Sequence, residues 1–365
     1  MMTMTVNSDH LLSSYSYELP IERIAQNPVT PRDSSKLMVV GRDGQTKHQT
    51  FRDLSQLLKP GDLLVLNNTK VMPARLYGHK TTGAPVEVLL LEEKQPNYWL
   101  ALVKPGKRLK LGSKILFSHH PTENLENSPF MATVVERDEA TGGRWLQLTI
   151  PPEQTFDDLL REFGHVPLPP YITDSQALPE QYQTIYAQKL GSSAAPTAGL
   201  HFTEELLTGL KAKNIDTAFI TLHVGVGTFR PLEVEDITTH KMHGEWLEVS
   251  PEAVAKIQQT QAAGGRVIAV GTTAVRALET AAATGKLQPF IGKSELYIYP
   301  GYQWRVVEGM VTNFHLPRSS LLLLVAALIS RSHLMEIYQE AIDHDYRFYS
   351  FGDAMLITPE AVIKS

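Results

Sequence analysis

The stretch Phe51-Arg-Asp-Leu-Ser-Gln-Leu-Leu-Lys-Pro-Gly-Asp-Leu-Leu-Val-Leu-Asn67 decides the class of fold. Its first half predicts a short amphipathic helix with Phe51, Leu54, Leu57 and Leu58 as its apolar residues, and Pro60-Gly61 then makes a turn. An apolar strand follows at residues 62–66. A helix, a turn and a buried strand in this order are typical of an α/β domain.

The next stretch, residues 73–152, has a different pattern. Short β-like runs are separated by turn residues, and little in it favours a long helix. The runs are Val86–Leu91, Tyr98–Val103, Lys114–Phe117, Met131–Arg137 and Trp145–Ile150. Five or six short strands at this spacing predict a small antiparallel β-barrel or sandwich inserted into the α/β body.

Helices and strands alternate again after Pro151. The predicted helices are Thr203–Lys213, Pro251–Ala263, Thr273–Thr284, Ser319–Ser330 and His333–Asp343, and the predicted strands are Asp216–His223, Arg266–Val270, Glu295–Tyr299 and Val306–Val311. We therefore predict a mixed-sheet α/β body formed by residues 1–72 and 153–365, with residues 73–152 as an inserted small antiparallel β-barrel domain.

Composition narrows the classes of function. The 365 residues contain no cysteine, which excludes disulfides, thiolate metal sites and a cysteine nucleophile. The net charge of −5 means that any binding to nucleic acid needs a local basic patch. The N-terminus lacks the pattern of a signal peptide, and the longest apolar run, Leu321–Ile329, is far short of the ~20 residues that span a bilayer. We expect a cytoplasmic protein with no membrane partner.

The densest unusual stretch is Gly191-Ser-Ser-Ala-Ala-Pro-Thr-Ala-Gly-Leu-His-Phe202. Core filling does not explain so many small residues, and glycines on both sides of Pro196 imply a tight loop where the backbone approaches something closely. We predict a ligand-binding loop; the alternative is a plain connector before the helix that starts at Thr203.

Two further glycine motifs follow predicted strands. His223-Val-Gly-Val-Gly-Thr-Phe229 lies where α/β folds place ligands, although it lacks the third glycine of the dinucleotide fingerprint. Val270-Gly-Thr-Thr273 opens a helix whose free backbone N–H groups could hold a carboxylate or phosphate. On that helix Arg276 and Glu279 share one face, either as functional groups or as an ordinary surface ion pair.

Histidines and carboxylates supply the candidate acid–base groups. His240-Lys-Met-His243 with Glu245 resembles a set of metal ligands, but the same groups suit acid–base work near pH 7 without a metal, and we expect none bound. His315, in Asn313-Phe-His-Leu-Pro317, is either functional or a hydrogen-bonded structural histidine.

One basic cluster lies in the predicted barrel. Lys104-Pro-Gly-Lys-Arg-Leu-Lys-Leu-Gly-Ser-Lys114 holds five cations, which could contact a phosphate backbone or simply form a charged edge that prevents aggregation. Pro31-Arg-Asp-Ser-Ser-Lys36 and Asn67-Asn-Thr-Lys70 place polar residues beside apolar runs.

Taken in order, these segments resemble the S-adenosylmethionine:tRNA ribosyltransferase-isomerase family of queuosine biosynthesis. The resemblance extends from Tyr17 to Ile357. The motifs that carry it are Pro31–Leu37, Gly61–Val71, Gly191–Phe202, His223–Pro231, His240–Glu245, Val270–Thr273, Val311–Pro317 and Tyr349–Met355. Lys36 and Lys70 stand where arginine is frequent in the family, and Asn68 where aspartate is common.

The resemblance implies an α/β domain with an inserted β-barrel and an unusual transferase activity. The ribosyl group of S-adenosylmethionine would move onto 7-aminomethyl-7-deazaguanine at the wobble position of a tRNA, giving epoxyqueuosine and releasing adenine and methionine. The sulfonium acidifies the ribose C5′ hydrogens, so a base could start ring opening without a metal or a redox cofactor. S-adenosylmethionine is then a substrate, tRNA is the macromolecular partner, and we expect a monomer.

The acid–base candidates are His201, His243, Glu279 and His315, and their spacing does not rank them. The resemblance also suggests substrate binding by Arg32, Asp33, Asn67, Thr69, Lys70, Arg75, Ala195, Pro196, Thr197, Ala198, Gly199, Phe202, His223, Gly225, Gly227, Thr228, Phe229, His240, Glu245, Gly271, Thr272, Thr273, Arg276, Thr312, Asn313, Phe314 and Asp353.

Two other classes of function are open. A metal-dependent hydrolase would use His240, His243 and Glu245. A noncatalytic RNA-binding protein would use the β insert alone, and would have no need of the small-residue loop.

Overall fold

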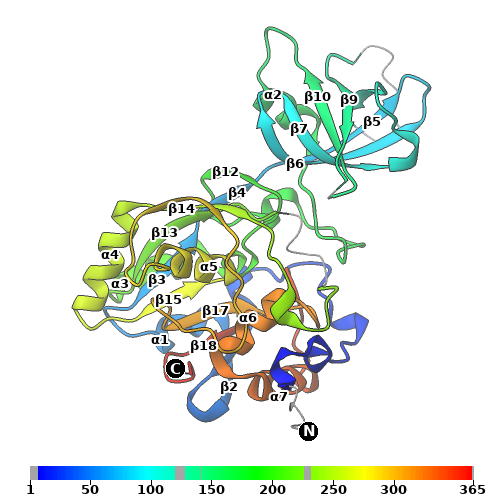
Figure 1. Ribbon diagram of the computed structural model, residues 1–365. Helices are drawn as coiled ribbons and strands as arrows, with labels where there is room; N and C mark the ends of the chain where they lie inside the picture. Colours follow the sequence, from blue (N-terminus) through cyan, green and yellow to red (C-terminus); the bar gives the residue numbers. More distant parts are fainter. Residues whose placement is uncertain (1–6, 120–127, 140, 226–231, 364–365) are drawn as a thin grey trace. The chain divides into compact units, whose positions relative to one another are not determined.

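The computed structural model describes residues 7–119, 128–139, 141–225 and 232–363. The chain forms two compact units: Met1–Lys70 with Pro169–Ser365, and Val71–Leu168. The first is a mixed α/β body and the second is a β-barrel (Figure 1), which confirms the predicted fold class.

A nine-stranded mixed sheet forms the centre of the body. Its order is β16 (Phe290–Ser294), β14 (Glu245–Val249), β13 (Asp216–Leu222), β3 (Leu63–Asn67), β15 (Val267–Val270), β17 (Gly309–Asn313), β18 (Ala354–Ile357), β1 (Lys36–Val40) and β2 (Thr46–Thr50). The four strands β13, β3, β15 and β17 run parallel, so their carboxyl ends meet at one edge. A separate pair joins β4 (Thr69–Val71) to β12 (Lys189–Ser192).

Helices cover both faces of the sheet because its central strands are apolar on both sides. Along β3, Leu63 and Val65 enter one core, while Leu64 and Leu66 enter the other, as the two-residue period of a strand requires. The first core includes α4 (Pro251–Ala262), α5 (Thr272–Ala281), α6 (Ser320–Ile329) and α7 (Arg331–Asp343). The second includes α1 (Leu54–Leu57) and α3 (Glu204–Ala212).

Six antiparallel strands form the closed barrel. Their order is β5 (Arg75–Lys80), β6 (Pro85–Gln95), β7 (Tyr98–Lys104), β10 (Arg144–Thr149), β9 (Met131–Arg137) and β8 (Lys114–Ser118), and β8 pairs with β5 to close the sheet. At that closure Gly78 faces the backbone of Leu116 with no room for a Cβ.

The inserted unit ends at Leu168 rather than at residue 152. Helix α2 (Phe156–Phe163) and strand β11 (Gly164–His165) follow the last barrel strand. Leu159, Leu160 and Phe163 are buried in the barrel core, and β11 pairs with β5, so both elements belong to this unit.

Two predicted strands were placed wrongly, for the same physical reason. No strand covers residues 295–299, because the guanidinium of Arg276 binds the carbonyl oxygens of Ser294 and Leu296. Strand β17 begins at Gly309 rather than at Val306, because the Glu279 carboxylate accepts the backbone N–H groups of Val306 and Val307. Buried side chains on α5 thus form the hydrogen bonds with these backbone segments that a neighbouring strand would otherwise form.

Among the described residues, no single helix is long and apolar enough to cross a membrane. The pair α6 and α7 reaches the required length and composition only together, and it is bent by 111° at the break.

Candidate active site

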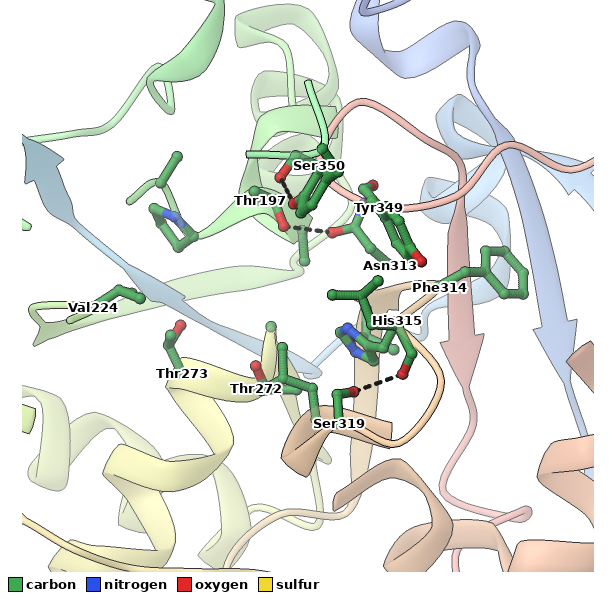
Figure 2. A pocket seen from close by; sticks show the side chains of 18 residues that line it. Thr197, Val224, Thr272, Thr273, Asn313, Phe314, His315, Ser319, Tyr349 and Ser350 are labelled. Atoms are coloured by element: carbon green, nitrogen blue, oxygen red, sulfur yellow. Dashed lines mark hydrogen bonds between the residues drawn. The ribbon is translucent and has the colours of Figure 1, made fainter. Parts of the chain in front are cut away.

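A cavity that is open to solvent lies at the carboxyl ends of three parallel strands of the body (Figure 2), and the space within it, including the solvent at its mouth, is about 710 Å³. Val224 follows β13, Gly271 follows β15, and Phe314 follows β17. The full lining is Tyr171, Ala195, Pro196, Thr197, Ala198, Val224, Gly271, Thr272, Thr273, Thr312, Asn313, Phe314, His315, Leu316, Ser319, Leu321, Tyr349 and Ser350. Because open α/β sheets bind ligands at this edge, we take the cavity as the candidate active site.

The small-residue loop supplies one wall through Ala195–Ala198. Ser192 ties the loop to the end of β13, since its hydroxyl donates to the Ala194 carbonyl (2.7 Å) and accepts from the Val224 N–H (2.9 Å). A Cβ on Gly271 would lie 3.6 Å from the Ala198 methyl. The small side chains are therefore needed for close packing of the loop against the start of α5.

Gly199 and Phe202, the other predicted binding residues of this loop, do not line the cavity. A Cβ on Gly199 would collide with the Tyr186 hydroxyl. Phe202 is buried against Phe51, with ring centroids 5.1 Å apart. Both residues pack the loop into the core.

Asn313 is held by a hydrogen-bond network that reaches behind the wall. Its amide nitrogen donates to His201 Nε2 (3.1 Å) and to the Tyr349 carbonyl (3.2 Å). Its Oδ1 accepts from the Thr197 hydroxyl (3.0 Å), as Figure 2 shows. Since Nε2 accepts, the proton of His201 lies on Nδ1 and donates to Ser35 Oγ (2.7 Å). His201 thus fixes Asn313 without lining the cavity.

His201 is an uncharged buried group. Burial, helped by the positive charges of Arg32 and Arg347, holds its pKa well below the ordinary value. Both ring nitrogens are engaged, and Phe51 stacks on the ring at 4.9 Å. This arrangement leaves no free ring nitrogen for a substrate.

His315 lines the cavity directly. Its Nε2 lies 2.9 Å from the Thr312 hydroxyl, and its backbone N–H donates to the Tyr338 hydroxyl (2.8 Å). Burial lowers the pKa of His315 to about 3, so the imidazole is neutral near pH 7. Of the four acid–base candidates, His315 alone is on the cavity wall.

Arg276 and Glu279 share a helix face but do not pair with each other. Arg276 forms a buried ion pair with Glu245, whose other carboxylate oxygen accepts the Gly225 N–H (2.9 Å). Glu279 accepts the backbone N–H groups of Arg305, Val306 and Val307. The alternative of an ordinary surface ion pair is therefore wrong, because spacing along a helix cannot show which tertiary groups lie opposite.

The predicted cluster of His240, His243 and Glu245 does not form a set of three metal ligands, although His243 is near enough to help burial lower the pKa of His240. Glu245 is buried against Arg276, His243 is exposed, and His240 packs on the Tyr297 ring at 5.2 Å. Within the described ranges, the group of three potential ligands that lies within 4.8 Å is instead His48, Glu340 and His344.

Five further predicted binding residues do not line the cavity. Asn67, Thr69 and His223 brace the ends of β3 and β13: Asn67 binds the backbone of Leu222, and Thr69 Oγ1 lies 2.7 Å from His223 Nδ1. Lys70 is exposed, and Arg75 belongs to the barrel, where it pairs with Glu87 (3.2 Å).

The Pro31–Leu37 motif lies behind the same wall. Arg32 donates from Nε to the Leu200 carbonyl (3.1 Å), while Asp33 pairs with Arg52 at 3.4 Å. Asp353 is buried and accepts from the backbone N–H of Lys36 (3.0 Å) and of Arg347 (2.8 Å). Gly227, Thr228 and Phe229 lie outside the described residues.

Sequence reasoning missed several lining residues. Tyr171, Val224, Leu316, Ser319, Leu321, Tyr349 and Ser350 were not chosen as site residues. Tyr349 and Ser350 lie inside a motif that carries the family resemblance, and Tyr349 has a positive φ of 70°, which is unusual for a non-glycine residue. Tyr171 lies in a stretch that matched no motif.

The five cations of the basic cluster are all exposed on the barrel. None of Lys104, Lys107, Arg108, Lys110 and Lys114 forms an ion pair within the part of the chain that the structure describes. They are therefore free to meet an external anion.

The fold and site define an α/β protein with an inserted barrel and a ligand cavity at its sheet edge. The model of the family described as "Queuosine biosynthesis protein" matches residues 12–357, and the chain belongs to this family. A protein of Nostoc sp. named S-adenosylmethionine:tRNA ribosyltransferase-isomerase is 63% identical over 97% of this chain and 94% of its own length. A protein of the same name from Thermosynechococcus vestitus is 58% identical over 97% of each chain.

A solved structure agrees with these sequence matches. The crystal structure of S-adenosylmethionine tRNA ribosyltransferase from Thermotoga maritima is 39% identical and covers 94% of this chain and 99% of its own, with a TM-score of 0.54.

Proposed function

We propose that this chain transfers and isomerises the ribosyl group of S-adenosylmethionine onto 7-aminomethyl-7-deazaguanine at the wobble position of tRNA, releasing adenine and methionine. The observation that carries this proposal is the identity of 63% over 97% of the chain to a relative named for the reaction. The metal-dependent hydrolase loses its support, because Glu245 is committed to Arg276.

The cavity suits the donor, which is a cation. Among the residues that the structure describes, its lining contains no lysine or arginine, so none of these side chains places a fixed positive charge against the sulfonium. Hydroxyl and amide groups from Thr197, Thr312 and Asn313 provide neutral hydrogen-bond partners. These groups would orient the ribose and the base within a largely apolar space.

We assign the role of general base to His315. Its imidazole lines the cavity and is neutral near pH 7, and although burial makes it a weak base, it can accept a proton from the ribose C5′ carbon because the adjacent sulfonium acidifies that carbon. The low pKa makes the resulting imidazolium a strong acid, which would then protonate the departing adenine. His201 acts as a positioning residue, because it reaches the site only through Asn313.

The proposal includes the partners and the setting. The exposed cations of the barrel would hold the tRNA backbone, and the enzyme would act as a cytoplasmic monomer with no resident cofactor. S-adenosylmethionine would be consumed as a substrate.

Adenine release tests the function. The chain is incubated with S-adenosylmethionine and tRNA that carries the aminomethyl base, and free adenine is measured by chromatography. We expect release that depends on both substrates. A matched tRNA with unmodified guanine at the wobble position provides the control, because it lacks the attacking amine. Equal release with both tRNAs, or none with either, would overturn the proposal.

A further inference from the structure

Two helix N-termini face the cavity, and they differ in how they are capped. At α6, Ser319 caps its own helix by accepting the Leu322 N–H (3.2 Å) and donating to the Leu316 carbonyl (2.8 Å). At α5, the N-cap is Gly271, with φ of 86° and no side chain to cap with. Within the described residues, the N–H groups of Thr272, Thr273 and Ala274 accordingly find no acceptor.

Unpartnered hydroxyls lie at the same place. Thr272 is only 8% exposed and lines the cavity, and its hydroxyl has no hydrogen-bond partner among the described residues. Thr273 Oγ1 is buried and also has no partner. Figure 2 shows the two side chains together at the first turn of α5. Leaving the buried Thr273 hydroxyl unpaired is costly, and a group bound at the start of α5 would satisfy it together with the free N–H groups.

The donors at this position suit an anion. Free N–H groups at the start of a ten-residue helix present partial positive charge, and two hydroxyls add donors. No acidic side chain among the described lining residues competes for this position. No lysine or arginine lines it either, so this end of α5 is the cavity's main source of positive potential among the described residues.

We propose that the first turn of α5 binds the carboxylate of the amino-acid end of S-adenosylmethionine. This inference rests on the proposed function. The donor carries one carboxylate, and the described lining, which has no cationic side chain, offers backbone and hydroxyl donors to receive it. The Gly271 backbone permits the approach, since a side chain there would be strained and would lie against Ala198. A phosphate of the tRNA is the other source of the same chemistry, and the test separates the two.

Decarboxylated S-adenosylmethionine is the probe, because it keeps the sulfonium, the ribose and the adenine and lacks only the carboxylate. We expect the wild-type enzyme to prefer S-adenosylmethionine by about tenfold or more in kcat/KM, the loss expected for a charge-assisted contact. Equal use of the two donors would overturn the inference. A wild-type enzyme that releases no adenine from S-adenosylmethionine would instead refute the proposed function.

Two variants locate the contact. Thr272→Val removes only the hydroxyl, whereas Thr272→Pro also removes a backbone N–H at the first helical position, where proline is tolerated. We expect the ratio of kcat/KM for S-adenosylmethionine to kcat/KM for the decarboxylated donor to fall several-fold in Thr272→Val and nearly to reach one in Thr272→Pro. In both variants the change should come from lower activity with S-adenosylmethionine, while activity with the decarboxylated donor stays the same. Thr280→Val, on the same helix but bonded to Ser294, is the matched control and should keep the full preference.

Two outcomes would overturn the inference at this stage. A full preference for the carboxylate in Thr272→Pro would place the carboxylate elsewhere. A rise in the KM for tRNA with an unchanged KM for S-adenosylmethionine would show that the anion is an RNA phosphate.

Discussion

The cavity wall and the layer behind it contain the same kinds of residue but use them differently. On the wall, His315 has one ring nitrogen near Thr312 and faces the space where a ligand fits. Behind the wall, His201 has both nitrogens engaged, by Ser35 and Asn313. Both rings are uncharged because burial depresses their pKa. The comparison shows that a histidine is available for chemistry when one of its ring nitrogens is free to meet a substrate. Neither the motif that contains the histidine nor its pKa distinguishes such a residue from a structural one.

The sharpest test of this comparison is His315→Gln. We expect kcat for adenine release to fall by about 10²–10⁴, the usual contribution of a general acid–base group. The amide still reaches Thr312, so the melting temperature should change little. Activity is measured at saturating substrates, and circular dichroism reports folding. His240→Gln, away from the cavity, is the control. A variant with wild-type kcat would remove His315 from the chemistry.

Ala198→Leu tests the wall by filling it. The added side chain must enter the cavity or push against Gly271, so we expect adenine release to fall by at least about tenfold and stability to drop by about 1–3 kcal/mol. Ala198→Ser, which adds little volume, should retain most activity. Urea unfolding separates the two effects. Normal turnover in a folded Ala198→Leu protein would show that substrates do not use this wall.

His201→Gln tests the supporting layer. We expect a stability loss of about 1–3 kcal/mol, because a buried hydrogen bond to Ser35 or Asn313 is lost, with a reduction in kcat of tenfold or less. The pH profile of kcat should keep its shape, since His201 transfers no proton. His201→Ala removes both hydrogen bonds, so its free energy of unfolding and its kcat should both be lower than those of His201→Gln. A collapse of kcat in His201→Gln as deep as in His315→Gln would contradict the distinction between the two layers.

The barrel extends the comparison to the second substrate. Replacing Lys107, Arg108 and Lys110 together by alanine should raise the KM for tRNA several-fold and flatten its salt dependence, while the KM for S-adenosylmethionine stays the same. Arg137→Ala provides a matched barrel variant, since that cation already pairs with Glu139 (3.3 Å). An unchanged tRNA KM and salt slope in the triple variant would leave these cations as solubility elements on a sheet edge.

The smallest expected effect is on the pH dependence of stability. Below about pH 6.5 the unfolded chain protonates His315, whereas the folded chain does so only near pH 3, so the free energy of unfolding should decrease as the pH falls through this window. His315→Gln should reduce that slope by up to about 1.4 kcal/mol per pH unit. Urea titrations at pH 5 and pH 7 measure it. Identical slopes in the two proteins would mean that His315 is protonated in the folded state as readily as in the unfolded chain.

Local pattern predicted most of the architecture. The apolar stretch at Leu63–Leu66 and the short β runs after residue 73 were enough for an α/β body with an inserted barrel, because periodicity reports burial directly. The sequence could not show that residues 295–299 and 306–308 lie outside the strands. Their backbone partners are Arg276 and Glu279, which lie on a helix elsewhere in the chain.

The site was predictable in part. Asn313 at the end of β17 and Thr272 just after β15 lie at the cavity, as the general rule for α/β sheets requires, and the small-residue loop adds Thr197. Which polar residues face the cavity depends on tertiary partners, so His201, Glu245 and Glu279 could not be separated from His315 by sequence. Tyr171 gave no local signal.

The position of β18 has a consequence for the synthesis of the protein. Strand β18 lies between β17 and β1, and Leu37 pairs with Ala354, so the β1–β2 hairpin joins the rest of the sheet only through residues near the end of the chain. Roughly 300 residues, which a ribosome adds in on the order of 15 to 60 seconds, separate the two partners. During that time the apolar edge of β1 is without its neighbour and is a natural site for a chaperone, and a nascent chain released before residue 354 would keep this edge exposed.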